Sequence, residues 1–222
     1  MDRVAAAILL IVVPVAFNVT FFGLQRRFDY PDILRRPTDE ILRRFASGGS
    51  GLRRLWYAFA VSALLFIPVP VLVHGLFAPA PWYLAVGTVF GIVAGVVQVA
   101  GLLRWPFVVG HLATAYAAPD ATPARRDAIA VVFDVIHRYG GVAIGEHLGY
   151  LFTALWTVLV AIATVATGLV PPLLGWLGLL PALAIFIGLF EEAGFAPAGP
   201  VAAIGYVLWS LWLVAFGLAL LV

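Results

Sequence analysis

The fold class is decided by residues 82–103, WYLAVGTVFGIVAGVVQVAGLL, which contain no charged side chain. A bilayer core about 30 Å thick is crossed by about 20 helical residues, so this stretch is long enough to span it. Five more predominantly apolar stretches are of similar length: residues 4–24, 55–77, 141–167, 173–190 and 200–222. The sequence therefore predicts an all-α polytopic membrane protein, a bundle of six transmembrane helices that forms a single domain over residues 1–222.

The composition supports a lipid environment. Hydrophobic residues make up 64% of the chain and charged residues 11%, with a mean hydropathy of +1.07, whereas soluble domains are about 45–50% apolar. The first apolar run is longer than the h-region of a signal peptide, so we expect a retained span. The absence of cysteine excludes disulfides, thiolate nucleophiles and Cys-ligated metals.

The arginines predict the orientation. All thirteen basic residues are Arg; the first and third connections carry eight and four of them, which leaves only Arg3 for the opposite side. This split of twelve against one favours odd-numbered loops in the cytoplasm and both termini outside a bacterial inner membrane. We expect anionic inner-leaflet lipid, and not nucleic acid, as the partner of these arginines. Aromatic side chains at the span ends, Trp56, Tyr57, Trp82, Tyr83 and Trp105, are typical of the headgroup level.

The first connection contains a near repeat, DILRR at 32–36 and EILRR at 40–44, with Thr38 as a candidate N-cap of the second copy. Ile41, Leu42 and Phe45 form an apolar face. The pattern predicts one or two amphipathic helices on the inner leaflet, followed by a glycine-rich hinge at 47–51; a solvated charged loop is the alternative. The residues expected at the lipid surface are Arg35, Arg36, Arg43 and Arg44.

Residues 104–139 are too apolar for an ordinary loop, and their one clear break is PDATP at 119–123. Thr122 as N-cap with Pro123 at the first helical position predicts a helix start there. We expect an extended helical hairpin between the third and fourth spans. Kinks are expected near Pro106 and at Gly140-Gly141.

Polar side chains inside hydrocarbon are costly, by about 2.5–3.5 kcal/mol for an ionisable group at mid-span, and are therefore informative. Three spans place such groups at one depth near the cytoplasmic side. We expect a polar cup open to the cytoplasm; its ligand- or proton-binding candidates are Glu146, Gln98, Asn18, Tyr150 and His147, with Arg104, Glu191 and Glu192 at the rim. The alternative is that these groups only hydrogen-bond to one another and fix helix packing.

The fourth span carries a polar stripe. Glu146, Tyr150, Thr153, Thr157 and Thr164 recur at helical spacing, so the stripe should face protein or water. His147 lies about 100° away and should face a neighbouring helix.

Other chemistry is less well supported. The four histidines lack the paired spacing of metal or haem ligands, so no metal and no cofactor is expected. Glu191-Glu192 is similar to the paired glutamates of intramembrane prenyl-protease-like enzymes, but Ala193–Ala196 contain no Arg and no His partners follow. Three glycines, Gly87, Gly91 and Gly95, form a small-residue ridge that fits an internal helix or a second copy of the chain.

Three segments resemble a known family: FDYPDIL at 28–34, GEHLGY at 145–150 and GYVLWSLW at 205–212. They are similar to bacterial integral-membrane proteins grouped as domain of unknown function 4386. The resemblance implies a multi-span helical bundle and supplies no substrate, reaction or catalytic residue. We therefore expect a non-catalytic binding, sensing or accessory protein, with a proton-coupled carrier that uses Glu146 as the first alternative and a membrane redox or hydrolytic enzyme as the second.

Overall fold

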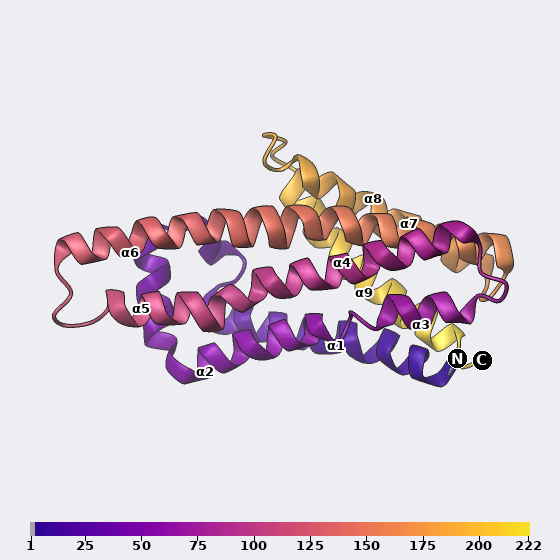
Figure 1. Ribbon diagram of the computed structural model, residues 1–222, viewed down its shortest axis with the longest axis horizontal. Coiled ribbons are helices and arrows are strands. Elements are labelled where there is room, and N and C mark those ends of the chain that lie inside the picture. Colours follow the sequence, from indigo (N-terminus) through magenta and orange to yellow (C-terminus); the bar gives the residue numbers. More distant parts are fainter. Residues whose placement is uncertain (1–2) are drawn as a thin grey trace. The chain divides into compact units, whose positions relative to one another are not determined.

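The computed structural model describes residues 3–222 and is 85% helical, with no strand in that range. Figure 1 shows the helices in chain order. The elements are α1 (Arg3–Phe28), the 3₁₀ helix η1 (Asp32–Arg35), α2 (Thr38–Leu64), α3 (Val69–Leu76), α4 (Trp82–Arg104), the π-helix η2 (Trp105–Val109), α5 (Gly110–Tyr116), α6 (Pro123–Ile136), the π-helix η3 (His137–Leu148), α7 (Gly149–Thr167), α8 (Pro172–Ile187), the 3₁₀ helix η4 (Gly188–Phe190) and α9 (Ala198–Ala219).

Six helical runs are long and apolar enough to cross a membrane, as the sequence predicts: Arg3–Phe28, Thr38–Leu76, Trp82–Tyr116, Pro123–Thr167, Pro172–Phe190 and Ala198–Ala219. Their surfaces fit lipid. On α1, apolar side chains exposed by 46–65% follow one another at helical spacing: Val4, Ile8, Val12, Val15, Val19 and Phe22. A continuous stripe of exposed apolar side chains is unfavourable in water and favourable in lipid, so the chain is a membrane protein.

The described chain divides into two compact units. Unit 1 comprises residues up to Val15, Ser62–Val97 and His147–Val222, and unit 2 comprises Ala16–Val61 and Gln98–Glu146. The helices α1 and α4 and the run from α6 to α7 each contribute residues to both units. Each unit has its own core and is described separately.

Unit 1 has a core of aromatic and small residues, and polar groups buried in it form hydrogen bonds. α7 packs on α8, and α8 on α9. Trp156 contacts Phe66 and Trp209 edge to face, with ring centroids 5.2 and 6.1 Å apart. The indole of Trp209 donates a 2.8 Å hydrogen bond to Thr157 Oγ1. The predicted threonine stripe therefore faces protein: Thr153, Thr157 and Thr164 are completely buried.

The glycine ridge on α4 packs inside unit 1. A Cβ added at Gly91 would lie 2.6 Å from Cδ1 of Trp156, and one at Gly95 would lie 2.8 Å from the Ile67 side chain. At Gly87 it would lie 3.2 Å from Leu159. Side chains of the same chain therefore lie beside the ridge, as expected where the glycines let an internal helix approach.

Unit 2 buries the apolar face of the first connection. Ile41, Leu42 and Phe45 are at most 2% exposed and pack in one core with Leu24, Phe28, Ile33, Trp56 and Trp105. The expectation that this face lies on the inner leaflet is therefore wrong: protein side chains cover it. Thr38 is the first residue of α2 and not its N-cap, and its hydroxyl donates a 2.6 Å hydrogen bond to Asp134 on α6.

The glycine-rich segment breaks α2, as expected for a hinge. Gly49 has φ +56° and ψ −150°, outside the helical region and reachable at low cost only by glycine. The second span is also interrupted, between Leu64 and Val69, where Pro68 precedes the short helix α3. The apolar run at 55–77 is therefore two helices and not one.

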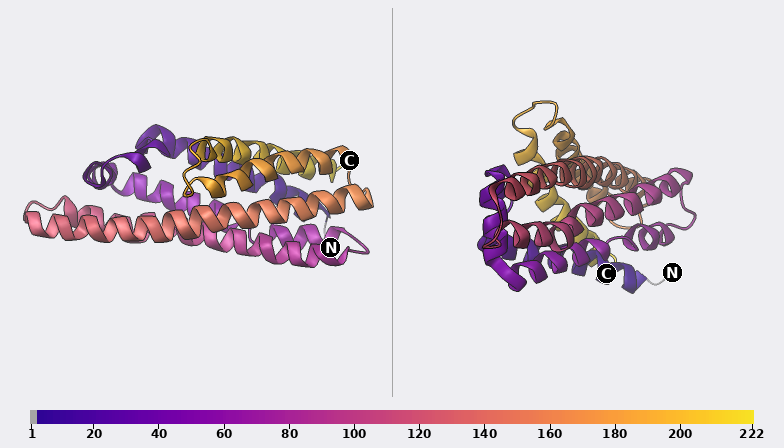
Figure 2. Two further views of the ribbon diagram at one scale, coloured as in Figure 1. Left: turned by 90° about the horizontal axis from the view of Figure 1, so that it is seen from above. Right: turned by 60° about the vertical axis from the view of Figure 1, so that its left-hand side comes forward.

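The extended hairpin is present. Figures 1 and 2 show α5 and α6 side by side, joined by residues 117–122. The side chain of Thr122 accepts a 3.2 Å hydrogen bond from the backbone N–H of Arg125, and Pro123 opens α6, as predicted. Both positions expected to kink, Pro106 and Gly140-Gly141, lie in π-helical segments, which widen the helix locally.

Candidate functional site

The most informative polar side chain of unit 2 is Arg104, the last residue of α4. Its side chain is only 8% exposed, so it does not stand at an exposed rim as the sequence led us to expect. Nη1 donates a hydrogen bond to the carbonyl of Gly101 one turn earlier. The guanidinium carbon lies 5.4 Å from the ring centroid of Trp105, a cation–π contact.

A crossing made of glycines allows this burial. A Cβ at Gly101 would lie 2.7 Å from Cα of Gly145, so the end of α4 and the π-helix η3 approach at backbone distance. A Cβ at Gly141 would lie 2.5 Å from the guanidinium carbon of Arg104. Any larger residue at position 141 would displace the arginine, so the glycines are what lets a buried cation lie against η3.

Glu146 and Tyr30 share the electrostatic environment of Arg104. Glu146 is half-buried in η3 and acts on both groups. Tyr30 lies in the connection after α1, outside the spans. Burial raises the pKa of its hydroxyl above the usual range; the charge of Glu146 raises that pKa further, while Arg104 acts in the opposite direction. The three residues therefore form one polar centre: Arg104, Glu146 and Tyr30.

An aromatic cluster surrounds the polar centre. The indoles of Trp56 and Trp105 are stacked with centroids 4.5 Å apart and planes 12° from parallel. The ring of Tyr30 meets Trp56 edge to face at 5.1 Å. On the other side, the ring of His137 stacks on Phe133 at 5.4 Å. A cation held in this environment is screened very little by water, so its interactions are strong.

Several nitrogen atoms in this cluster are buried without a hydrogen-bond partner anywhere in residues 3–222. They are Nε1 of Trp56, Nε1 of Trp105, Nε of Arg104 and Nδ1 of His137. The first three can only donate. Because an unpaired buried donor costs about 1–3 kcal/mol, such groups in a native protein call for an explanation.

The other residues predicted for the polar cup are divided between the units. Asn18 on α1 and Gln98 on α4 are half-buried members of unit 2, like Glu146. Tyr150 belongs to unit 1, where its ring lies 5.7 Å from that of Tyr206 and covers Gly188. His147 is exposed.

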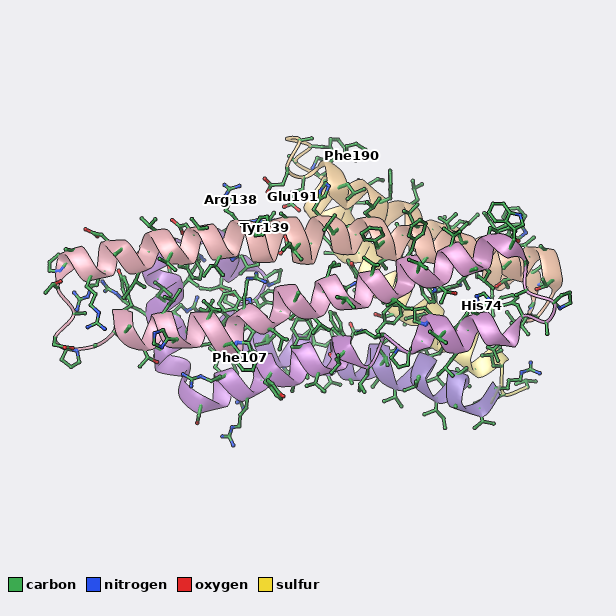
Figure 3. All side chains as sticks on the ribbon, in the orientation of Figure 1. His74, Phe107, Arg138, Tyr139, Phe190 and Glu191 are labelled. Atoms are coloured by element: carbon green, nitrogen blue, oxygen red, sulfur yellow. The ribbon has the colours of Figure 1, made fainter. Side chains whose placement is uncertain are left out.

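The predicted rim acids begin a loop of unit 1. Glu191 and Glu192 follow η4, as Figure 3 shows for Glu191, and the carboxylate of Glu191 lies against Gly199. The candidate lipid-surface residues are exposed: Arg35, Arg36, Arg43 and Arg44. Two of them form ion pairs on the surface, Arg43 with Asp39 and Arg44 with both Glu40 and Asp29, at 3.5–3.9 Å.

The histidines do not assemble a site. His74 Nδ1 lies 2.9 Å from the Thr88 hydroxyl in unit 1, and His111 is exposed in unit 2. Throughout residues 3–222, no group of three or more His, Asp or Glu side chains is arranged to hold a metal ion.

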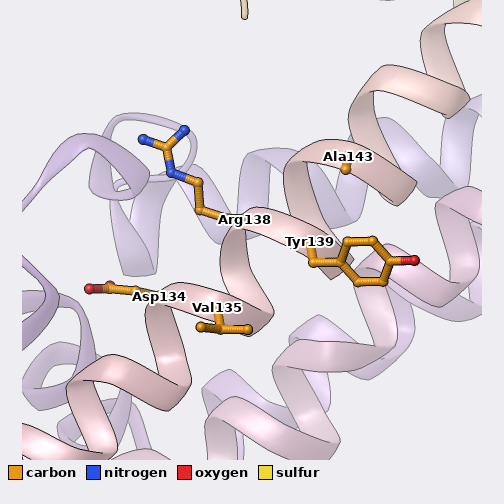
Figure 4. A pocket seen from close by; sticks show the side chains of 5 residues that line it. All are labelled: Asp134, Val135, Arg138, Tyr139 and Ala143. Atoms are coloured by element: carbon orange, nitrogen blue, oxygen red, sulfur yellow. The ribbon is translucent and has the colours of Figure 1, made fainter.

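An open hollow lies on the surface of α6 and η3. Its lining residues are Asp134, Val135, Arg138, Tyr139 and Ala143. Figure 4 shows Arg138 and Tyr139 leaving the helix in different directions, so they do not converge on a common point. The hollow shares no residue with the polar centre.

A family model described as domain of unknown function (DUF4386) matches residues 5–217, nearly the whole chain. The chain belongs to this family. The resemblance noted in the three sequence segments is thereby confirmed. Beyond the DUF4386 match, no curated protein and no solved structure is similar to the chain.

In this DUF4386 member, sequence reasoning missed the aromatic part of the site. Trp56 and Trp105 were expected at the headgroup level, yet both are completely buried, whereas Tyr57 and Trp82 are exposed by 51% and 81%. Tyr30 was singled out only as part of the FDYPDIL segment. Tyr30 lies between α1 and α2, and its place in this family-like motif is the sequence feature that could have pointed to it.

Proposed function

We propose that this protein is a non-catalytic binding, sensing or accessory protein whose ligand site is the polar centre of unit 2. The observation that carries the proposal is a buried arginine, Arg104, beside Glu146 and Tyr30 and among donors without partners. Ionisable groups within membrane spans are expensive and are retained chiefly where they bind or move something. No arrangement of nucleophile, base and oxyanion donors accompanies them in the described residues, which favours binding over catalysis.

Recovery of a ligand tests this function. The protein would be purified in mild detergent and its extract analysed by mass spectrometry, alongside Glu146→Gln and Arg104→Gln. We expect a molecule that co-purifies in stoichiometric amount with the wild type, is depleted in Arg104→Gln and changes in amount in Glu146→Gln. Glu192→Gln, an exposed acid in unit 1, is the matched control. Identical extracts from all four proteins would contradict the proposal.

We further propose a bacterial inner membrane, with both termini outside the cytoplasm and anionic lipid beside the arginine-rich connections. The exposed Arg35, Arg36, Arg43 and Arg44 support this orientation, because inner-leaflet lipid attracts such residues. A reporter fused after Val222 that is active only outside the cytoplasm is the expected result. Activity inside the cell would reverse the orientation.

A proton-coupled small-molecule carrier is the second candidate. It is favoured by Glu146, an acid that lies half-buried in a π-helical segment, a type of distortion frequent at functional sites. In proteoliposomes, a carrier would acidify or alkalinise its lumen when substrate is supplied, and Glu146→Gln would abolish that flux. Substrate uptake that is insensitive to an imposed pH gradient would exclude it.

A further inference from the structure

The unpartnered nitrogens of unit 2 have one chemistry in common. Trp56 Nε1, Trp105 Nε1 and Arg104 Nε are all N–H donors, and none of the described residues accepts from them. They belong to residues in direct contact, since the two indoles stack at 4.5 Å and the guanidinium lies over Trp105. A group that satisfies them must therefore offer acceptor oxygens and not further donors.

The charge of Arg104 indicates which chemical class of acceptor fits the site. The guanidinium of Arg104 is 8% exposed, and its Nη1 donates a hydrogen bond to the Gly101 carbonyl. Hydrogen bonds between a cation and an anionic oxygen are about twice as strong as neutral ones. A carboxylate or phosphate oxygen therefore suits Arg104 and the indole N–H groups better than an ether or a ketone.

The side chains around the donors indicate what kind of molecule carries the acceptor. The donors are enclosed by rings: Phe28 meets Trp105 at 5.4 Å, and Tyr30 meets Trp56 at 5.1 Å. A hydrated inorganic ion would have to lose its water to reach donors enclosed in this way, whereas an anionic head carried on an acyl or alkyl chain can approach from the lipid. Lipid is the solvent for the spans that form the unit, so such molecules are available at high concentration.

We propose that Arg104, Trp56 and Trp105 bind the anionic oxygen head of an amphiphile, a carboxylate or a phosphate carried on an apolar tail. This inference rests on the proposed binding function and names its ligand class. Glu146 lowers the affinity for this ligand, because its carboxylate repels an anion placed beside Arg104. Neutralising Glu146 should therefore strengthen binding of the anionic head, the opposite of what a site for cations would show.

Binding of defined probes tests the ligand class. Radiolabelled dodecyl phosphate would be titrated onto the delipidated protein in dodecyl maltoside micelles, which carry no anionic oxygen, with dodecanoate, dodecanol and inorganic phosphate as competitors. We expect dodecanoate to compete and dodecanol to compete at least about tenfold more weakly, since dodecanol lacks the charge-assisted hydrogen bond, which contributes about 1.5–3 kcal/mol. Inorganic phosphate should also compete at least about tenfold more weakly, since it lacks the apolar tail. Equal competition by dodecanol would overturn the oxyanion assignment, and equal competition by inorganic phosphate would overturn the amphiphile.

Variants locate the site. Trp56→Phe and Trp105→Phe keep an aromatic ring and remove the N–H donor, and each should weaken binding of dodecyl phosphate about tenfold. Trp209→Phe is the matched control, because its N–H is already bonded to Thr157, and it should leave affinity unchanged. Glu146→Gln should tighten binding. Equal affinity in all four variants would overturn the inference.

These results are separable from those of the proposed function. If a neutral co-purified molecule is lost in Arg104→Gln while dodecyl phosphate does not bind, the site binds a ligand of another class and only the present inference fails. If nothing co-purifies and no probe binds, both fail.

Discussion

The two units differ in whether the indole N–H groups of their buried tryptophans have hydrogen-bond partners. In unit 1, Trp209 donates to Thr157 Oγ1 and Trp212 to the carbonyl of Leu174, both at 2.8 Å. In unit 2, Trp56 and Trp105 are buried just as deeply and donate to nothing in the described chain. Since a polar group is normally buried only with a partner, the first arrangement is that of a packed scaffold, and the second is the one on which the proposed acceptor site rests.

The largest effect should come from filling the scaffold of unit 1. In Gly91→Leu the new side chain begins 2.6 Å from Trp156, in a core with no free space, so the free energy of unfolding should fall by about 3 kcal/mol. Gly141→Ala in unit 2 meets the movable tip of Arg104 and should cost less than half as much. Equilibrium unfolding in mixed dodecyl maltoside and SDS micelles measures both. Equal losses would remove the distinction between scaffold and site.

A smaller effect is expected from Trp209→Phe, which loses a bonded N–H. The hydroxyl of Thr157 already donates to the carbonyl of Thr153, so it loses its only described donor, and the free energy of unfolding should fall by about 1–2 kcal/mol. The same micelle titration applies. Thr157→Val should cause a similar loss, and the double variant should cost less than the two single losses together.

Trp105→Phe sharpens the comparison further. The substitution removes an unpaired buried donor, which offsets the lost ring area, so ligand-free protein should change by less than about 0.5 kcal/mol. Added dodecyl phosphate should then stabilise the wild type more than the variant. A loss as large as that of Trp209→Phe, in delipidated protein, would mean that the indole N–H is bonded after all.

The smallest effect concerns alkaline pH. The pKa of Tyr30 is raised above its ordinary value of 10.0, so the folded chain keeps this proton where the unfolded chain releases it. The associated stability is present below pH 10 and is lost as pH rises above it. Tyr30→Phe should therefore unfold less readily than the wild type between pH 10 and pH 11, measured relative to neutral pH. Tyr57→Phe, at an exposed tyrosine of unit 2, is the control for the loss of a phenol hydroxyl.

The sequence predicted the spans well because lipid imposes a simple rule on composition. Runs of about 20 apolar residues can be found without knowledge of what they pack against. The same holds for Thr122 and Pro123, whose capping role depends only on neighbouring residues. Family membership was also recognisable from three short segments.

The site was harder to predict because it depends on long-range packing. Trp56 and Trp105 are far apart in sequence, and nothing local distinguishes a buried stacked pair from two interfacial rings. Ile41, Leu42 and Phe45 show an apolar face, but the pattern does not say whether lipid or protein covers it.

The π-helical segment His137–Leu148 has a consequence for chain length. A π-helix contains more residues per turn than an α-helix, so the segment holds surplus residues relative to the axis that it follows. Deleting one residue between Gly140 and Gly145 would let the chain tighten into α-helical turns and leave α7 in register. The same deletion within α7 would rotate everything after it by about 100°. Natural variation in the length of this helix should therefore be concentrated beside the buried arginine.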